Sequence, residues 1–258
     1  MVVADLHVHT TNSDGTLTLE TVPAAAREAN VEAVAITDHD RIHPELSDPV
    51  IVQDGIEIIH GIELRVATEN QRVDLLGYGV RRTDRLESLV EQLQANRIER
   101  ARAIVDCVED RLGVDLSVSL EPGVGRPHVA RAIADSDASY DYEGAFRELI
   151  GDGCPCYVAR DIPAFEKGRQ ILAEACAVVG LAHPLRYDNP EAALALATEL
   201  DAVERYYPYS GDVDHALVES VFEDGTLLAT GGSDAHDETL GRAGLDRGEY
   251  ERIRQRLS

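Results

Sequence analysis

The sequence predicts an α/β fold in which strands and helices alternate around a barrel, interrupted by a mainly helical insertion. Short apolar runs recur along the chain, stretches with helical spacing separate many of them, and most runs end in an acidic residue or a histidine. In a βα barrel the carboxyl ends of the strands converge on one mouth, where polar side chains build an active site. An open doubly wound sheet is the alternative, although such a sheet usually draws its site from fewer strand ends.

Seven apolar runs are the predicted strands, and four stretches rich in Ala and Leu have the spacing of helices. The alternation of the two predicts parallel βα units. The predicted helices are residues 19–29, 165–176, 191–200 and 213–223. The predicted strands are residues 2–4, 33–36, 56–62, 73–78, 177–182, 200–203 and 227–230, and they lead into or contain Asp5, Asp38, Glu63, Asp74, His183, Glu204 and Asp234, respectively.

The alternation breaks between about residues 84 and 160, where the pattern becomes mostly helical. This region begins with the long stretch Leu86–Leu112, whose charged face predicts a helix exposed to solvent. We therefore predict that residues 1–83 and 161–258 form the barrel and that residues 84–160 form a helical insertion or lid packed beside it.

The composition limits the location and the partners of the chain. No apolar run approaches the roughly 18 residues of a membrane span, and no charged and apolar leader precedes the start, so we expect a cytoplasmic protein. The net charge is −24, with Lys167 as the single lysine among 258 residues. Such a charge repels membrane surfaces and polyanions, which argues against a stable complex with long nucleic acid. The excess of acidic residues also predicts adaptation to a salt-rich cytoplasm.

The four cysteines are predicted to be reduced, partly buried thiols. They are Cys107, Cys154, Cys156 and Cys176, and none of their spacings is Cys-x-x-Cys. A chain of this size does not need a disulfide framework. Cys154 and Cys156 flank a proline and could hold a soft metal ion, but no second pair completes such a site.

Histidines and acids at the strand ends predict a metal centre. Asp5, His7 and His9 alternate along one strand and therefore share a face. Isolated histidines would more often pack in the barrel wall, but burying this many ionisable groups without a cation would cost several kcal/mol each. The other strand ends supply further groups of the types that bind divalent ions: Asp14, His39, Glu63, His183, Asp234 and His236.

These residues resemble the PHP phosphoesterases, a family named for polymerase and histidinol phosphatase. The four motifs that carry the resemblance are Asp5–Thr10 with Ser13-Asp14-Gly15, Thr37–Asp40, Gly61-Ile62-Glu63 and Gly232–His236. Three further motifs resemble the stand-alone branch that contains nucleoside 3′,5′-bisphosphate phosphatases and a 5′ exoribonuclease acting on short RNA. They are Leu76-Gly77-Tyr78, Arg126-Pro127-His128 and Leu181–Pro184.

The resemblance implies a distorted, seven-stranded, TIM-like (β/α)7 barrel with an inserted domain and two or three divalent ions per chain. Mn²⁺ is the expected ion, with Mg²⁺, Zn²⁺ or Fe²⁺ as alternatives. The implied ligands are His7, His9, Glu63 and Asp234 for one ion, Glu63 with His128 for a second, and Asp14, His39 and His236 for a third. His183 and Arg186 are implied to stand near the phosphate, and Asp5, Asp38 and Ser233 to orient ligands.

Asp74 departs from the family pattern, because relatives usually carry a histidine just before Leu-Leu-Gly-Tyr. A carboxylate can still ligate and would favour Mn²⁺ or Mg²⁺ over Zn²⁺ at the second site. It could equally leave that site weak or empty.

The predicted reaction is hydrolysis of a small phosphomonoester by a metal-activated hydroxide. The expected substrate is a nucleotide such as a nucleoside 3′,5′-bisphosphate, or a short oligonucleotide. Arginines near the motifs offer phosphate ligands because a guanidinium binds phosphate bidentately, and Arg160 is predicted to act with His183 and Arg186. The proton donor is either His183 or a water on the metal. Four tyrosines could stack a base or simply pack: Tyr157, Tyr206, Tyr207 and Tyr209.

Three alternative functions are compatible with the sequence. Histidinol phosphate is another possible substrate of the same barrel. Amide or lactone hydrolysis in related metal barrels often uses a modified lysine at a strand end, but Lys167 lies in a predicted helix. A non-catalytic sensor of metal or nucleotide would belong to a different class of protein. The sequence makes no prediction about oligomeric state.

Overall fold

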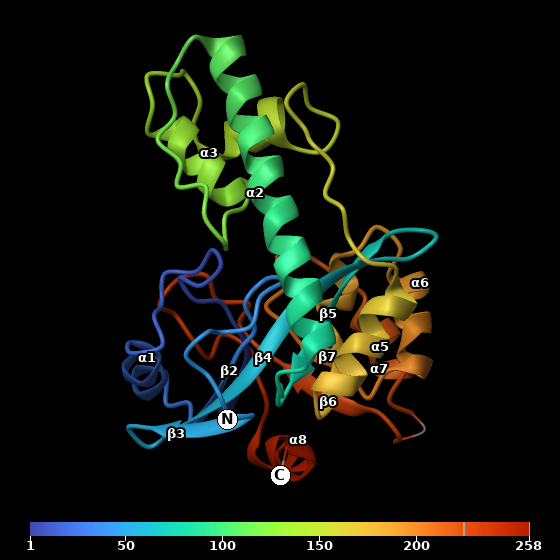
Figure 1. Cartoon of the computed structure of the whole chain (residues 1–258). Helices are drawn as coiled ribbons and strands as arrows, with labels where there is room; N and C mark the ends of the chain where they lie inside the picture. The colour runs from blue at the N-terminus through green and yellow to red at the C-terminus, as the bar shows by residue number, and fades with distance from the viewer. Residues whose placement is uncertain (224, 258) are drawn as a thin grey trace. The chain divides into compact units, whose positions relative to one another are not determined.

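The computed structural model describes residues 1–223 and 225–257 (Figure 1). Positions 224 and 258, which fall in the predicted second barrel segment, lie outside the described residues. The chain divides into two compact units, one formed by Met1–Val90 with Ile162–Ser258 and the other by Glu91–Asp161. Within the described residues, no helix is both long enough and apolar enough to cross a membrane.

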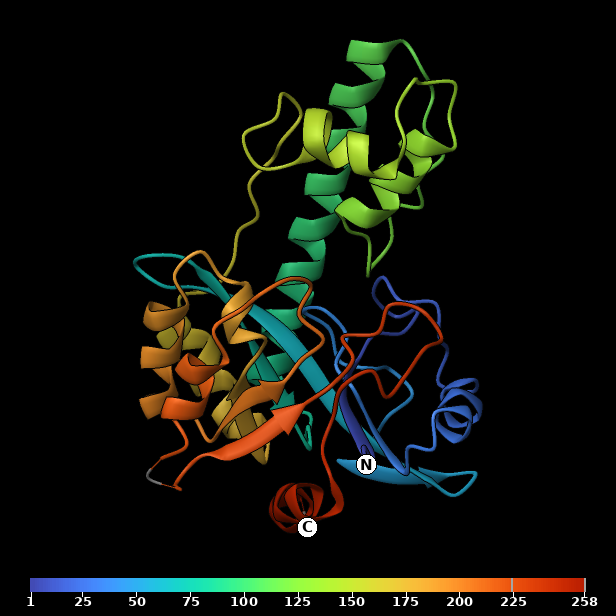
Figure 2. The ribbon, with the colours of Figure 1, turned by 180° about the vertical axis from the view of Figure 1, so that it is seen from behind.

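The first unit is a barrel-like sheet, which confirms the predicted fold class. Its strands lie in the order β1-β2-β4-β5-β6-β7-β8. The two ends of this order meet, because His9 N donates to Ala235 O at 2.9 Å just beyond β1 and β8. Figure 2 shows the orange β8 beside the dark-blue β1. The strands are β1 Ala4–Val8, β2 Ala33–Ile36, β4 Ile56–Ala67, β5 Arg72–Tyr78, β6 Val178–Leu181, β7 Ala202–Tyr206 and β8 Leu228–Gly231.

One strand of the barrel runs against the prediction of parallel βα units. β5 is antiparallel to both β4 and β6. Only residues 68–71 connect β4 to β5, and a parallel crossover needs about a dozen residues or more, so this connection has to be a hairpin. The reversal distorts the barrel and sends the carboxyl end of β5 away from the mouth.

An additional strand, β3 Val50–Gln53, pairs with β4 outside the barrel order and was not predicted. It joins β4 through Asp54 and Gly55, whose φ angles are 51° and 83°. Asp-Gly is the sequence signal for such a two-residue hairpin, because both positions need a left-handed backbone.

The helices of the first unit lie close to the predicted ranges, with two differences. The predicted helix 191–200 divides into the short helix α6 and a 3-10 helix at Ala195–Glu199. The helix α8 was not predicted; its Tyr250, Ile253 and Leu257 pack in one core cluster with Ala4 and Leu6 of β1. The α-helices are α1 Val22–Glu28, α5 Phe165–Ala175, α6 Pro190–Leu194, α7 His215–Ser220 and α8 Arg247–Leu257.

The second unit is helical and has a core of its own. It contains most of α2 Asp84–Leu112, followed by α3 Arg126–Ala134, α4 Tyr142–Ala145 and a π-helix at Phe146–Ile150. Its buried cluster includes Ile104 and Val108 of α2 and Val129 and Ile133 of α3.

A disulfide between Cys107 and Cys156 corrects the prediction that all four cysteines are reduced. Cys154 and Cys176 are free. The two paired cysteines are 49 residues apart, so their spacing in the sequence does not indicate that they form a disulfide. The disulfide joins α2 to the last segment of the second unit.

Candidate metal centre

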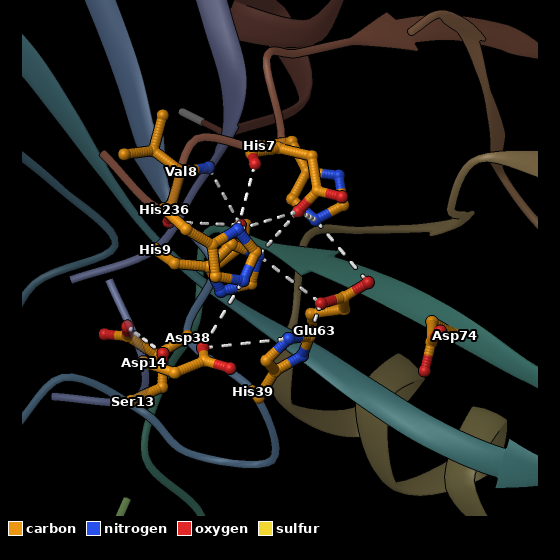
Figure 3. A network of polar contacts seen from close by, with 12 residues as sticks. His7, Val8, His9, Ser13, Asp14, Asp38, His39, Glu63, Asp74 and His236 are labelled. Carbon is orange, nitrogen blue, oxygen red and sulfur yellow. Dashed lines mark hydrogen bonds and ion pairs between the residues drawn. The ribbon is translucent and has the colours of Figure 1, made fainter. Parts of the chain in front are cut away.

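Four residues of the first predicted ion site come together at the mouth of the barrel. His7 and His9 alternate at the end of β1, and each places Nε2 at 3.5 Å from an oxygen of Glu63. Asp234 lies beside them, with Oδ1 at 3.1 Å from His9 Nε2 and 3.5 Å from His7 Nε2. Figure 3 shows His7, His9 and Glu63 turned toward one another. Atoms at these distances can share one cation.

The residues of the third predicted ion site also meet. Asp14 Oδ1 lies 3.8 Å from His39 Nε2 and 3.4 Å from His236 Nε2. Ligand atoms of these three residues and of His9 all lie within 4.8 Å of one another. His39 also reaches the first group, since its Nδ1 lies 2.6 Å from Glu63 Oε2. The two groups therefore share His9 and adjoin at Glu63.

His183 lies among candidate ligands. Its Nε2 is 3.0 Å from Glu63 Oε1 and 3.9 Å from Asp74 Oδ2. Two ligand-competent groups contain it, one with Glu63 and Asp74 and one with His7 and Asp234. This position suits a ligand at least as well as the phosphate-facing role expected from the sequence.

Asp74 lies near this second group but is already bound by an arginine. Arg65 Nε donates to Oδ1 at 2.7 Å, and Arg65 Nη2 donates to Oδ2 at 2.5 Å. Asp74 is 1% exposed. A cation at this position must therefore compete with a guanidinium for both oxygens.

Close backbone packing at Gly232 and positive φ angles at His183 and Asp234 help to bring these side chains together. A Cβ on Gly232 would lie 2.3 Å from His7 N, so only glycine lets the segment after β8 approach β1. His183 and Asp234 have φ angles of 27° and 49°. Non-glycine residues in this region of the backbone carry strain of order 1 kcal/mol or more, and such strain is concentrated at functional sites.

Glu204 is a member of the site for which the sequence motifs predict no role. It is fully buried at β7, where Oε1 lies 3.0 Å from His7 Nδ1 and Oε2 accepts from His183 N at 2.6 Å. A carboxylate on the second ring nitrogen fixes the tautomer that leaves Nε2 free to bind metal. Its place at a strand end was visible in the sequence, but its pairing with a histidine 197 residues away was not.

Asp38 and Asp5 hold the loops that carry the ligands. Asp38 accepts hydrogen bonds from Thr10 N at 2.8 Å and Ser13 Oγ at 2.7 Å, which fixes the loop leading to Asp14. Asp5 accepts from Ser233 N at 2.8 Å and Ser233 Oγ at 2.6 Å, just before Asp234. Both carboxylates therefore hold the loops that carry the metal ligands in place, through hydrogen bonds to backbone N–H and hydroxyl groups.

The electrostatics of the centre fit a bound cation. Burial raises the pKa of Glu63, but His39 and His7 outweigh it and hold that pKa well below its usual range. Burial, together with His39 and His236, lowers the pKa of His9 to about 4. His7 Nε2 and His9 Nε2 are buried and make no hydrogen bond among the residues that the structure describes. An anionic carboxylate facing unpartnered imidazole nitrogens is the donor set of a divalent metal site.

A cavity of about 520 Å³ opens onto the centre, lined in part by Asp234 and His236. Arg186 lies on its wall, where Nη1 donates to Asp234 Oδ2 and to Tyr207 Oη, both at 2.9 Å. The rings of Tyr207 and Tyr209 form another part of the wall. The cavity therefore presents a guanidinium and two aromatic rings beside candidate metal ligands.

The remaining predicted site residues, His128 and Arg160, belong to the second unit. His128 stands in the first turn of α3, where Nδ1 accepts from Gly125 N at 3.1 Å. Their roles as a metal ligand and a phosphate ligand stay predictions.

Known proteins of similar sequence are enzymes. The chain is 28% identical over 254 residues to the phosphoribosyl 1,2-cyclic phosphate 1,2-diphosphodiesterase of Eggerthella lenta, covering 91% of this chain and 94% of that one. It is 29% identical over 201 residues to the 3′,5′-nucleoside bisphosphate phosphatase of Chromobacterium violaceum, with 73% and 69% covered. It is 29% identical over 197 residues to the 5′-3′ exoribonuclease Rnm of Escherichia coli, with 72% and 67% covered. These names agree with the predicted enzyme class, a hydrolase acting on phosphoric ester bonds.

Two solved structures share the fold across nearly the whole chain. One, from Bifidobacterium adolescentis, is provisionally described as a metal-dependent phosphoesterase; it superposes with a TM-score of 0.80 at 22% identity, covering 98% of this chain and 96% of that one. The other, an amidohydrolase from Chromobacterium violaceum with bound sulfate and no metal, gives a TM-score of 0.76 at 23% identity with the same coverage. Residues 5–258 match the PHP domain. With its strand-end histidines and acids gathered at one barrel mouth, the chain belongs to the PHP family, as its motifs predict.

Proposed function

We propose that the barrel hydrolyses a small phosphate ester with divalent cations held by His7, His9, Glu63 and Asp234 and by Asp14, His39 and His236. The observation that carries this proposal is the pair of buried imidazole nitrogens, His7 Nε2 and His9 Nε2, which make no hydrogen bond among the described residues and lie 3.5 Å from the carboxylate of Glu63. They lie next to a cavity that reaches Asp234 and His236. We expect Mn²⁺ because the centre combines imidazole and carboxylate ligands, which suit this ion.

Divalent ions in this centre supply positive charge to phosphate oxygens and make water a nucleophile at neutral pH. The chain's own groups orient the reactants. Arg186, steadied by Tyr207 and Asp234, offers a guanidinium to a phosphate in the cavity. Glu204 keeps His7 Nδ1 engaged, so that Nε2 faces the centre. The buried Asp38 and Asp5 keep the ligand loops in place, which avoids reorganisation during the reaction.

The proposed substrate is a phosphorylated nucleoside, either a nucleoside 3′,5′-bisphosphate or a short oligonucleotide. The names of the three relatives support this, since each refers to a phosphorylated ribose, a nucleotide or RNA. The cavity wall supports it too, because Tyr207 and Tyr209, with ring centroids 4.7 Å apart, offer aromatic surface for a base.

A cyclic phosphodiester of ribose is the second candidate substrate. The diphosphodiesterase of Eggerthella lenta matches over 91% of this chain, more than the bisphosphate phosphatase does. Nothing in the cavity favours histidinol phosphate, which stays a comparison substrate. The expected cytoplasmic location and the salt-adapted surface remain predictions.

Phosphate release from adenosine 3′,5′-bisphosphate, with and without Mn²⁺, tests the proposal. We expect turnover that requires Mn²⁺ and disappears in His9→Ala. The same panel contains a 5′-phosphorylated short RNA, a ribose 1,2-cyclic phosphate and histidinol phosphate. If the protein bound these ligands tightly but hydrolysed none of them, the result would contradict the proposed enzyme and favour a non-catalytic sensor.

A further inference from the structure

Tyr207 holds one oxygen of the candidate metal ligand Asp234. Its hydroxyl lies 2.8 Å from Asp234 Oδ2, whereas Asp234 Oδ1 lies 3.1 Å from His9 Nε2 and 3.5 Å from His7 Nε2. An ionised carboxylate can only accept hydrogen bonds, so the hydroxyl donates its proton to Oδ2. The two oxygens of Asp234 therefore have different neighbours, a phenol on Oδ2 and the imidazole nitrogens of the metal centre on Oδ1.

Arg186 donates to the same oxygen of Asp234 and also to Tyr207. Its Nη1 lies 2.9 Å from Asp234 Oδ2 and 2.9 Å from Tyr207 Oη. A hydroxyl donates one hydrogen bond and can accept others, so Tyr207 satisfies the arginine and the carboxylate at once. The Arg186 side chain is 52% exposed, and holding a long, exposed side chain in one geometry costs entropy. The hydroxyl of Tyr207 is therefore the better fixed of the two donors.

An irregularity in β7 aims Tyr207 at this oxygen. The register with β8 shifts between Glu204 and Tyr206, where two steps along β7 match one step along β8. In a regular strand Glu204 and Tyr206 would share a face, but an extra residue reverses the alternation, as in a β-bulge. Tyr206 consequently turns its hydroxyl to Glu249 at 2.6 Å, while Tyr207 reaches Asp234. Bulges next to functional sites are known to redirect side chains in this way.

Neighbouring rings restrict the ring of Tyr207. Its centroid lies 4.7 Å from that of Tyr209 and 5.4 Å from that of His183. Tyr209 is itself held, because its hydroxyl accepts a hydrogen bond from Leu185 N at 3.3 Å. These contacts keep the hydroxyl of Tyr207 beside Asp234, so that the carboxylate is oriented before any cation binds.

We propose that Tyr207 is a positioning residue of the metal centre, which turns Asp234 so that Oδ1 faces a divalent cation shared with His7 and His9. The inference rests on the metal centre of the proposed function. A hydrogen bond to the outer oxygen of a ligating carboxylate fixes its orientation, and groups with this role support metal affinity. A neutral phenol orients the ligand without opposing the charge of the cation, which distinguishes Tyr207 from Arg186.

Calorimetric titration of Mn²⁺ into the metal-free full chain, without substrate, tests the proposal. Tyr207→Phe removes only the hydroxyl, so we expect at least one ion to bind about tenfold more weakly. The melting temperature of the metal-free variant should match that of the unaltered chain, which a purely structural role would not allow. Tyr207→Met also lacks the hydroxyl and should lose as much affinity. A loss in Tyr207→Met but not in Tyr207→Phe would assign the effect to ring packing and overturn the proposal.

Tyr206→Phe is the matched control, because it also removes a hydrogen bond from a phenol to a carboxylate, in this case to Glu249 outside the metal centre. It should bind Mn²⁺ as the unaltered chain does. Equal weakening in Tyr206→Phe, or undiminished affinity in Tyr207→Phe, would overturn the positioning role even if the unaltered chain releases phosphate. The expected loss of affinity in a protein that hydrolyses none of the proposed substrates would instead overturn the hydrolase alone. Failure of the unaltered chain to bind Mn²⁺ would overturn both.

Discussion

Arg65 donates a hydrogen bond to each carboxylate oxygen of Asp74, from Nε at 2.7 Å and from Nη2 at 2.5 Å. Asp74 raises the pKa of Arg65, so this guanidinium stays charged. The pair occupies the position where the family usually offers a histidine to metal. A permanent organic cation therefore already balances the charge that a metal ion would balance there.

The first prediction concerns the number of ions. We expect the chain to retain about two Mn²⁺ after dialysis, because two ions suffice for phosphoester chemistry. The additional site beside Asp74 should bind Mn²⁺ only weakly. Arg65→Gln frees both Asp74 oxygens, so it should strengthen the weak site by at least about tenfold. Elemental analysis and calorimetric titration measure both quantities.

Arg27→Gln serves as the control for Arg65, because Arg27 is exposed on α1 and contacts Asp54 only through a backbone carbonyl. Three tight sites in the unaltered chain, with no response to Arg65→Gln, would show that the ion pair does not weaken the site.

The second prediction concerns Glu204. Glu204→Gln keeps the shape of the side chain but removes the charge beside His7 Nδ1. We expect Mn²⁺ affinity to fall about 10- to 100-fold, as happens when the carboxylate behind a metal-binding histidine is lost. Glu219→Gln is the matched control, since Glu219 pairs with Arg205 at the surface. Equal affinities in the two variants would mean that Glu204 only fills space.

The third prediction concerns acid stability. Burial, together with Arg82 and His43, lowers the pKa of His60 from its ordinary 6.5 to about 4. Between these values the unfolded chain binds a proton that the folded chain does not, so the free energy of unfolding falls as the pH falls through this window. At pH 5 this loss amounts to about 2 kcal/mol.

His60→Leu removes the titrating group while filling the same buried position, where His60 is 0% exposed. Urea unfolding of metal-free protein at pH 7.5 and pH 5 should show a smaller acid loss in this variant than in the parent. His215→Gln, at an exposed position, should match the parent. An identical acid loss in His60→Leu and the parent would refute the linkage.

The fourth prediction concerns the disulfide. Cys107 and Cys156 close a loop with a sequence separation of 49 residues, and the chain-entropy relation gives about 4 kcal/mol for a loop of this length. We expect Cys107→Ser to lower the stability of the second unit by an amount of this order, measured by urea unfolding followed with hydrogen exchange. Cys176→Ser is the comparison, because Cys176 is a free thiol. Equal losses in the two variants would count against the disulfide.

The sequence predicted the site best where metal-binding residue types recur at the two-residue period of a strand or at a strand end. His7 and His9 were predictable as neighbours because residues two apart share a face of a strand. The clustering of His39, Glu63 and Asp234 followed from the convergence of strand ends in a barrel. Local pattern sufficed in these cases, because each motif lies within a few residues.

Contacts between distant segments were not predictable in the same way. Glu204 approaches His7 across 197 residues, and Arg65 meets Asp74 only because β4 and β5 form a hairpin. The contact between Arg65 and Asp74 does not follow from the predicted parallel arrangement of β5, because these two residues face each other only in antiparallel register. The sequence does contain a signal for the strand β3, because Asp54-Gly55 is typical of a two-residue hairpin turn.

Anomalous scattering from Mn²⁺-soaked crystals would locate the bound ions directly. We predict a Mn²⁺ peak roughly 2.0–2.3 Å from His7 Nε2, His9 Nε2 and an oxygen of Glu63, and a second peak between Asp14, His39 and His236. Both peaks should vanish in crystals of His9→Ala, whose imidazole adjoins both groups. Fully soaked crystals with no anomalous density among these side chains would contradict the metal centre and, with it, the proposed hydrolase.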